Sequence, residues 1–348
     1  MTLTPFLLAP AALDRRAAIP DTRAMAVYTD ITDEELGALL AGYDIGEALV
    51  FKGIAEGVQN SNFLLETTAG RYILTVYEER VETAELPYFL GLMYWLADHG
   101  FPSATPILTR AGEMITHVRG KPVAIVSFMA GLSMRRPGAA QCRELGRALA
   151  WLHEAGAGFD RTRANDLGQV RWAGMFAPLK AEAEALKPGL AAVIDADIAA
   201  IAAAWPKDLP AGVIHADLFP DNVFFKGGVF AAAIDFYFAC NDLLAYDLAI
   251  CLNAWCFEAD GSFNVTSAQA MIAGYQSRRV LSPAEKAGLP VLAWGGAMRF
   301  FLTRLKDWRS TPAGALVRPH DPLEYERKLA VHRSAQHGGG LLLFGDLA

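Results

Sequence analysis

The chain is poor in cysteine. Its 348 residues include only four, Cys142, Cys240, Cys251 and Cys256, and no two of them form a CxxC pair. This spacing argues against a disulfide framework. We therefore expect four buried thiols in the reducing environment of the cytoplasm.

Basic residues and long apolar runs are also scarce. Lys and Arg total 31 against 38 Asp and Glu, which gives a net charge of −7, and no Lys/Arg block is present. The most apolar stretches, Val193–Trp205 and Val229–Cys240, contain aspartates and are shorter than the roughly 20 residues that a bilayer requires. The sequence predicts no nucleic-acid partner and no membrane span.

The two ends of the chain differ from the rest. In residues 1–24 the basic residues follow the apolar stretch Leu3–Leu13, which is the reverse of the order in a secretory signal. Met25 opens a segment that looks like a natural start. We interpret residues 1–24 as a flexible extension or a misassigned start, and residues 337–348 as a tail.

Residues 25–130 have the pattern of a small mixed α/β lobe. Apolar residues recur at helical spacing over Leu86–Ala97, and Gly100 ends this helix. The turn Thr68–Arg71 separates two alternating segments and predicts a hairpin. Strands are expected at Leu49–Lys52, Asn62–Thr67, Tyr72–Tyr77, Met114–Val118 and Pro122–Phe128.

Residues 131–336 are mainly helical in pattern. Helices are expected over Ala139–Ala155 and Ala181–Trp205, and strand-like runs return at Val213–Phe225 and Val229–Phe238. The predicted fold is α+β and two-lobed, with a small β-rich N-lobe and a large helical C-lobe. A ligand cleft is expected where the two lobes meet.

The clearest chemical signal is His215-Ala-Asp217-Leu-Phe-Pro-Asp221-Asn222, followed by an apolar strand that ends at Asp235. Phosphoryl transfer from ATP needs positioning, magnesium and a carboxylate near the attacking hydroxyl. Asp217 is placed to accept the hydroxyl proton. The Asn222 carbonyl oxygen and the Asp235 carboxylate are hard ligands suited to Mg²⁺.

Other readings of this motif are weaker. His215 and Asp217 share a strand face and suit zinc, but no second His or Cys lies at suitable local spacing. We expect His215 to brace the loop by hydrogen bonds, with Asp221 as a solvent-facing carboxylate. Asp247 is expected at a helix start or bracing the loop.

The motifs resemble the kinase-like superfamily that includes aminoglycoside phosphotransferases and choline kinases. Within it, the sequence is similar to bacterial homoserine kinases of the aminoglycoside-phosphotransferase-like type, from Met25 to about Val331. The stretches that carry this similarity are Gly53–Phe63, Ile73–Glu78, Glu85–Phe89, His215–Phe225, Ile234–Cys240, Tyr246–Ile250, Asn253–Cys256 and Arg299–Leu305.

The resemblance implies a protein-kinase-like fold and phosphorylation of the L-homoserine hydroxyl with ATP and Mg²⁺, giving O-phospho-L-homoserine for threonine biosynthesis. It implies a cytoplasmic monomer or homodimer. A related kinase acting on an amino alcohol, an aminoglycoside or a sugar is the alternative. A nucleotide-binding module without activity is a third reading, but Asp217, Asn222 and Asp235 are all present.

The resemblance also places the nucleotide. The loop Gly53–Asn62 would cover the phosphates, with Gly57 allowing close approach and Asn60, Ser61 and Asn62 supplying polar contacts. Phe128 and Met129 would form the hinge beside adenine. Thr75 stands where most kinases have lysine, so Lys52 and Arg71 are candidate replacements, although either is expected to be a surface charge.

An amino-acid substrate needs a partner for its carboxylate, and arginine matches two oxygens. Arg299 and Arg304 lie in the apolar segment Trp294–Leu305. We favour Arg299 as the clamp, while Arg304 is open to an ion pair with Asp307 or Glu258. Further candidates that line the acceptor pocket are Tyr237, Asn253 and Trp255, although core packing also explains Trp255.

Overall fold

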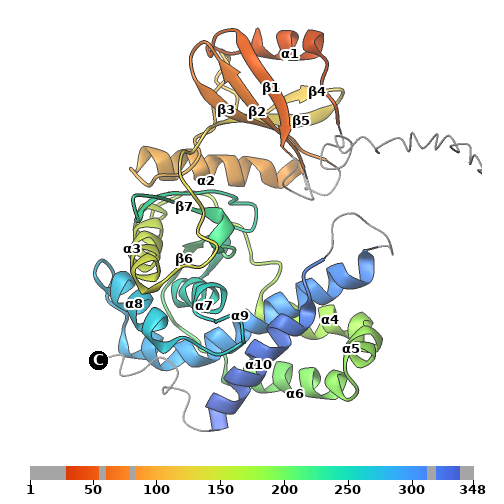
Figure 1. Ribbon diagram of the computed structural model, residues 1–348, viewed down its shortest axis with the longest axis vertical. Coiled ribbons are helices and arrows are strands. Elements are labelled where there is room, and N and C mark those ends of the chain that lie inside the picture. The colour runs from red at the N-terminus through yellow and green to blue at the C-terminus, as the bar shows by residue number, and fades with distance from the viewer. Residues whose placement is uncertain (1–28, 55–59, 79–82, 312–318, 338–348) are drawn as a thin grey trace, which may run out of the picture.

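The structure is a computed structural model that describes residues 29–54, 60–78, 83–311 and 319–337. Gly57 and the predicted extension 1–24 lie outside the described residues, as does nearly all of the predicted tail. A small sheet lies at one end of the molecule and a larger group of helices at the other (Figure 1).

The N-lobe is built on a five-stranded antiparallel sheet with the order β1-β2-β3-β5-β4. One face packs on α1, Asp33–Leu40, which begins with a capping box between Thr32 and Glu35. This face has its own apolar core, to which Phe63, Leu65 and Leu74 contribute. The strands are β1 Ala48–Ile54, β2 Ser61–Thr67, β3 Arg71–Val76, β4 Thr116–Val118 and β5 Lys121–Ser127.

The helix α2, Leu86–Asp98, follows the sheet in sequence but packs on the other lobe. Its buried residues Leu86, Phe89, Leu90, Met93 and Leu96 belong to the same apolar core as the C-lobe helices. In Figure 1, α2 lies between the sheet and the helical part. The apolar repeat predicted this helix correctly.

The C-lobe is mostly helical. Its described residues form two antiparallel strand pairs, β6 Ala211–Ile214 with β9 Cys240–Leu243 and β7 Val223–Lys226 with β8 Val229–Ala233. The helices are α3 Ala139–Ala155, α4 Trp172–Phe176, α5 Lys180–Leu186, α6 Leu190–Ala204, α7 Leu244–Trp255, α8 Val265–Gln276, α9 Pro283–Ser310 and α10 Pro322–His337.

Two predicted segments differ from the structure. The single helix expected over Ala181–Trp205 is two helices, because the chain leaves the helix at Lys187–Gly189, where Gly189 has a φ of 82°. The strand run expected over Val213–Phe225 is interrupted by the motif loop, whose residues form a turn and a short 3-10 helix at Pro220–Asn222.

The four cysteines are free and buried, as expected. Among the described residues, no helix combines the length and the apolar character that a bilayer span requires.

Candidate active site

The motif residues gather at the ends of two β pairs. His215 follows β6, Asn222 precedes β7 and Asp235 follows β8. The Ile234 amide donates to the Asn222 carbonyl over 3.0 Å, and His215 Nε2 lies 3.0 Å from the Ile234 carbonyl oxygen. These two contacts hold Asp235 beside the loop that carries Asp217 (hereafter the catalytic loop, residues 215–222).

Asp217 is half-buried within the catalytic loop. Asn222 Nδ2 donates to its carbonyl oxygen at 2.9 Å and to its Oδ2 at 3.3 Å. Burial raises the pKa of Asp217 to about 7, and the nearby Arg299 guanidinium opposes that rise. A carboxyl with a pKa near neutrality is well matched to proton transfer at physiological pH.

Asn222 and Asp235 fit a magnesium site by their chemistry. Because Asn222 uses its amide nitrogen to hold Asp217, its Oδ1 is the atom left to bind a cation. Asp235 retains contact with solvent, yet the surrounding protein and the charge of Asp221 raise its pKa. Hard oxygens near extra negative charge suit Mg²⁺, which commonly takes one or two protein ligands together with substrate phosphates.

Backbone contacts hold the catalytic loop in place. The amides of His215 and Ala216 donate to the two Asp247 carboxylate oxygens at 2.8 and 2.9 Å. Ala216 has a φ of 61°, a left-handed conformation that non-glycine residues adopt at a cost in energy. Asp247, on α7, therefore stabilises the strained turn before Asp217.

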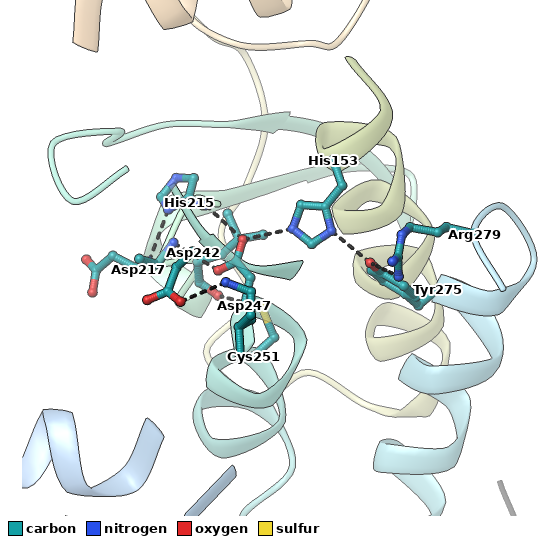
Figure 2. A network of polar contacts seen from close by, with 11 residues as sticks. His153, His215, Asp217, Asp242, Asp247, Cys251, Tyr275 and Arg279 are labelled. Atoms are coloured by element: carbon teal, nitrogen blue, oxygen red, sulfur yellow. Dashed lines mark hydrogen bonds and ion pairs between the residues drawn. The ribbon is translucent and has the colours of Figure 1, made fainter. Parts of the chain in front are cut away.

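A chain of polar side chains leads from Asp247 through His153 and Tyr275 to Arg279 (Figure 2). His153 on α3 lies 3.1 Å from Asp247 Oδ2 and 2.8 Å from the Tyr275 hydroxyl on α8. Arg279 donates to Tyr275 at 3.1 Å and to Glu285 at 2.8 Å. Although burial acts to raise it, hydrogen bonding by His153 and the loop amides lowers the pKa of Asp247.

Arg299 contacts the catalytic loop directly. Its side chain is buried, donates to the Ala216 carbonyl and stacks 4.3 Å from the Phe300 ring centroid. The structure thus gives Arg299 a backbone partner within the loop. The predicted role as a substrate clamp stays a prediction.

The other three predicted substrate residues have protein partners. The Tyr237 hydroxyl lies 2.7 Å from that of Tyr77, and the Trp255 indole donates to the Leu218 carbonyl at 2.8 Å. Asn253 on α7 is fully buried and donates to the carbonyl of Ala249, one turn earlier in α7, and to that of Ala293 on α9. Tyr237 links the lobes, whereas Trp255 and Asn253 hold helices and the loop together.

The predicted nucleotide residues lie on both faces of the sheet. Thr75 pairs with Asn62 across the strands and donates to its Oδ1 at 2.9 Å. Thr75 also pairs with Ala124, which belongs to the core on the C-lobe side. Asn62 and Thr75 therefore face the junction of the lobes.

Ser61 and Asn60 have different surroundings. Ser61 Oγ donates to Glu78 at 2.7 Å, and Asn60 Oδ1 accepts from the Glu78 amide at 3.4 Å. Lys121 also pairs with Glu78. This cluster connects β2 to β5 beside the loop. The sequence motifs do not predict it, because Ser61, Glu78 and Lys121 are far apart in sequence.

The expected hinge and cation candidates lie at the sheet surface. Phe128 is exposed and its amide donates to the Arg71 carbonyl at 3.1 Å, while Met129 packs on the larger core. Lys52 is exposed. The Arg71 side chain is 61% exposed and pairs with Glu66. By strand register, Lys52 and Arg71 lie on the same sheet face as Asn62 and Thr75, so both stay candidate cations.

Solved structures share this fold at low sequence identity. An amicoumacin kinase matches with a TM-score of 0.64 and 15% identity, covering 89% of this chain and 95% of its own. An aminoglycoside phosphotransferase from Alicyclobacillus acidocaldarius also gives 0.64 at 15% identity, covering 92% and 97%. These likenesses confirm the kinase-like fold.

Curated relatives are far closer in sequence. A homoserine kinase of a Caulobacter species is 67% identical over 92% of this chain and 99% of its own length. The homoserine kinases of Phenylobacterium zucineum and Methylobacterium nodulans are 67% and 60% identical over 93% and 89% of this chain, and over 99% and 96% of their own lengths. The model of the phosphotransferase enzyme family matches residues 50–281. The chain therefore belongs to the phosphotransferase enzyme family and, within it, to the homoserine kinases.

Proposed function

We propose that the protein transfers the γ-phosphoryl group of ATP to the hydroxyl of L-homoserine, giving O-phospho-L-homoserine and ADP. The observation that carries this proposal is the union of Asp217, Asn222 and Asp235 at one end of two β pairs, in a chain 67% identical to homoserine kinases. Threonine biosynthesis is the corresponding pathway.

The residues divide the work of phosphoryl transfer. Asp217 accepts the proton of the homoserine hydroxyl as its oxygen bonds to the γ-phosphorus and the bond to ADP breaks. Asn222 Oδ1 and Asp235 would hold Mg²⁺, which would supply positive charge to neutralise the phosphates. Asp247 and Arg299 keep the catalytic loop in its strained form, so that Asp217 is positioned before substrate arrives.

The nucleotide lies under the sheet, on the face that carries Asn62 and Thr75. Their mutual hydrogen bond places two neutral polar groups where most kinases have a lysine. Charge neutralisation would then come from Mg²⁺, from backbone amides of the loop Gly53–Asn62, or from a cation on the same sheet face, for which Lys52 and Arg71 are the candidates.

An assay of ADP release tests the substrate. With MgATP, we expect turnover with L-homoserine and little with D-homoserine, L-serine, choline or kanamycin. Turnover on another of these alcohols, with homoserine inert, would instead identify a different hydroxyl kinase of the same fold.

The variant Asp217→Asn tests the base. Loss of the proton acceptor is expected to lower kcat by about 10³-fold, while the dissociation constant for MgATP, measured by calorimetry, stays within about threefold of the wild type because no nucleotide contact is removed. A kcat within tenfold of the wild type would assign the proton transfer to another group.

We infer that the enzyme works in the cytoplasm as a monomer or homodimer. The four buried free thiols support a reducing compartment. Cell fractionation tests the location, and light scattering of the purified protein measures the mass in solution.

A further inference from the structure

The substrate of the proposed function is a zwitterion, and a group of side chains on α9 and α10 has matching charges. Arg304 donates to Glu324 at 2.6 Å, and Lys328 lies 3.1 Å from the other oxygen of Glu324. From the sequence, Asp307 or Glu258 is expected as the ion-pair partner of Arg304, and the observed partner is Glu324. Two cations share one carboxylate, so this group, Arg304–Glu324–Lys328, carries a net positive charge.

The group lies at the surface of the C-lobe without being fully solvated. The Arg304 side chain is 12% exposed, Lys328 is 7% exposed and Glu324 is 44% exposed. A half-buried excess of positive charge is unfavourable unless an anion balances it. The carboxylate of an amino acid is such an anion.

Aromatic rings connect this group to the catalytic loop. Phe219, within the loop, packs edge-on against Phe300 at 4.8 Å, and Phe300 lies 5.4 Å from Tyr325. Arg304 stacks 4.5 Å from the Tyr325 ring. Because Phe300 and Arg304 are one helical turn apart, they share the face of α9 that meets the loop.

Tyr325 provides an independent sign of a missing polar partner. It is fully buried, and its hydroxyl has no hydrogen-bond partner among the described residues. Burial raises the pKa of Tyr325, and Asp217 adds to that rise while Arg304 lowers it. Tyr325 is thus within electrostatic range of both the proposed base and Arg304.

We propose that Arg304 and Glu324 bind the two charged ends of the amino acid, with Arg304 holding the α-carboxylate and Glu324 the α-ammonium. This inference rests on the proposed function. In homoserine two methylene groups separate the α-carbon from the hydroxyl. The Tyr325 and Phe300 rings, both buried, and the Phe219 ring connect Arg304 to the catalytic loop that carries Asp217. Arg299 is engaged with a backbone carbonyl of the catalytic loop, whereas the partner of Arg304 is a half-exposed side chain, Glu324, which can move when an anion binds.

The test uses substrates that lack one charge each. 3-Aminopropan-1-ol is homoserine without its carboxylate, and 4-hydroxybutyrate is homoserine without its ammonium group. In Arg304→Met, we expect kcat/KM for L-homoserine to fall about 100-fold, because a charge-assisted pair is lost. The kcat/KM for 3-aminopropan-1-ol should change less than about threefold, since it makes no such contact.

Glu324→Gln is expected to show the complementary pattern. Its kcat/KM for L-homoserine should fall while that for 4-hydroxybutyrate holds or rises, because the ammonium contact is lost and the cations remain. The KM for ATP should stay unchanged in both variants.

Arg333→Met is the matched control. Arg333 also lies on α10 and pairs with Asp197 of α6 at 2.5 Å, so its loss tests the effect of loosening α10 without touching the Arg304 group. We expect lower thermal stability with the same preference for homoserine over 3-aminopropan-1-ol. Should Arg304→Met fold poorly, Arg304→Lys keeps the charge, loses the planar fork, and is expected to show a smaller loss of the same preference.

Three outcomes decide the matter. If Arg304→Met lowers kcat/KM equally for L-homoserine and for 3-aminopropan-1-ol, Arg304 only connects α9 to α10, and the proposal is overturned. Unchanged kcat/KM for homoserine in Arg304→Met would overturn it as well. A wild-type enzyme inert toward homoserine would overturn the proposed function, and this inference with it.

Discussion

At the scale of single residues, the catalytic loop depends on one carboxylate outside it, that of Asp247 on α7. Asp247 accepts from two consecutive amides of the catalytic loop and holds Ala216 at a φ of 61°. Burial acts to raise the pKa of Asp247, but hydrogen bonds from those amides and from His153 keep it below its usual value. The folded form therefore favours the ionised carboxylate.

This predicts how stability depends on pH. Because the folded-state pKa of Asp247 is lower than its unfolded value, its contribution is complete above about pH 4, the unfolded value, and is lost as the pH falls through the folded value. Asp247→Asn should cost about 3 kcal/mol at pH 7. The difference between variant and wild type, from urea unfolding, should shrink at lower pH; a difference independent of pH would contradict the assignment.

The same residues show what the sequence predicted and what it missed. His215, Asp217, Asn222 and Asp235 are close together in the chain, so spacing alone placed them in one site. Asp247 was recognised as a helix-start or loop-bracing residue, and the structure confirms the bracing.

The partners that lie far apart in sequence were not predictable from spacing. His153 and Tyr275 are 94 and 122 residues from their partners in the buried chain, and a histidine within an Ala/Leu-rich helix has no distinguishing local pattern. The sequence predicts an ion pair of Arg304 with Asp307 or Glu258, whereas the structure pairs it with Glu324 of α10, a contact that depends on how α9 and α10 pack.

At the scale of elements, the crossing of α3 and α8 brings His153 to Tyr275. Two glycines permit the backbones to touch. A Cβ on Gly146 would lie 1.9 Å from the Met271 carbonyl oxygen, and one on Gly274 would lie 2.0 Å from that of Arg143. Both neighbours are backbone atoms, so the helices must separate to accept any side chain.

Gly146→Ala should therefore destabilise the protein by about 3 kcal/mol and lower kcat, since separation of the helices breaks the His153–Tyr275 contact. Thermal unfolding and the ADP assay measure the two effects. The control is Gly37→Ala in α1, where a Cβ meets nothing within 4 Å. Gly37→Ala is expected to raise the free energy of unfolding by about 0.5–1 kcal/mol. A similar loss of stability in both variants would contradict the role of Gly146 in the close approach of α3 and α8.

At the scale of the whole molecule, the boundary between cores does not follow the boundary between lobes. The sheet and α1 form one core, whereas α2 shares the core of the C-lobe helices. Arg163 of the C-lobe also pairs with Glu85, just before α2, at 2.9 Å. Within the sheet, β5 contributes Ala124 and Val126 to the C-lobe core, so β1 and β2 with α1 are the part best able to move over a base that includes α2.

Hydrogen exchange tests this division. We expect the sheet to open locally while α2 stays folded. Backbone amides of β2 and β3 should therefore exchange hydrogen at least about tenfold faster than the amides of α2 and α7. Mass spectrometry of peptides from each element gives the order. Exchange of α2 together with the sheet would show that the N-lobe opens as one unit.

The attachment of Thr29 has a practical consequence for protein engineering. Its amide donates to Ser61 Oγ at 3.0 Å and its hydroxyl accepts from Lys121 at 2.8 Å, so the chain enters the sheet beside the connection between β1 and β2. A fusion partner joined ahead of residue 29 is consequently tethered next to the start of β2, beside the loop proposed to cover the nucleotide phosphates. Because α10 runs away from the sheet (Figure 1), a purification handle placed after it is attached farther from that loop.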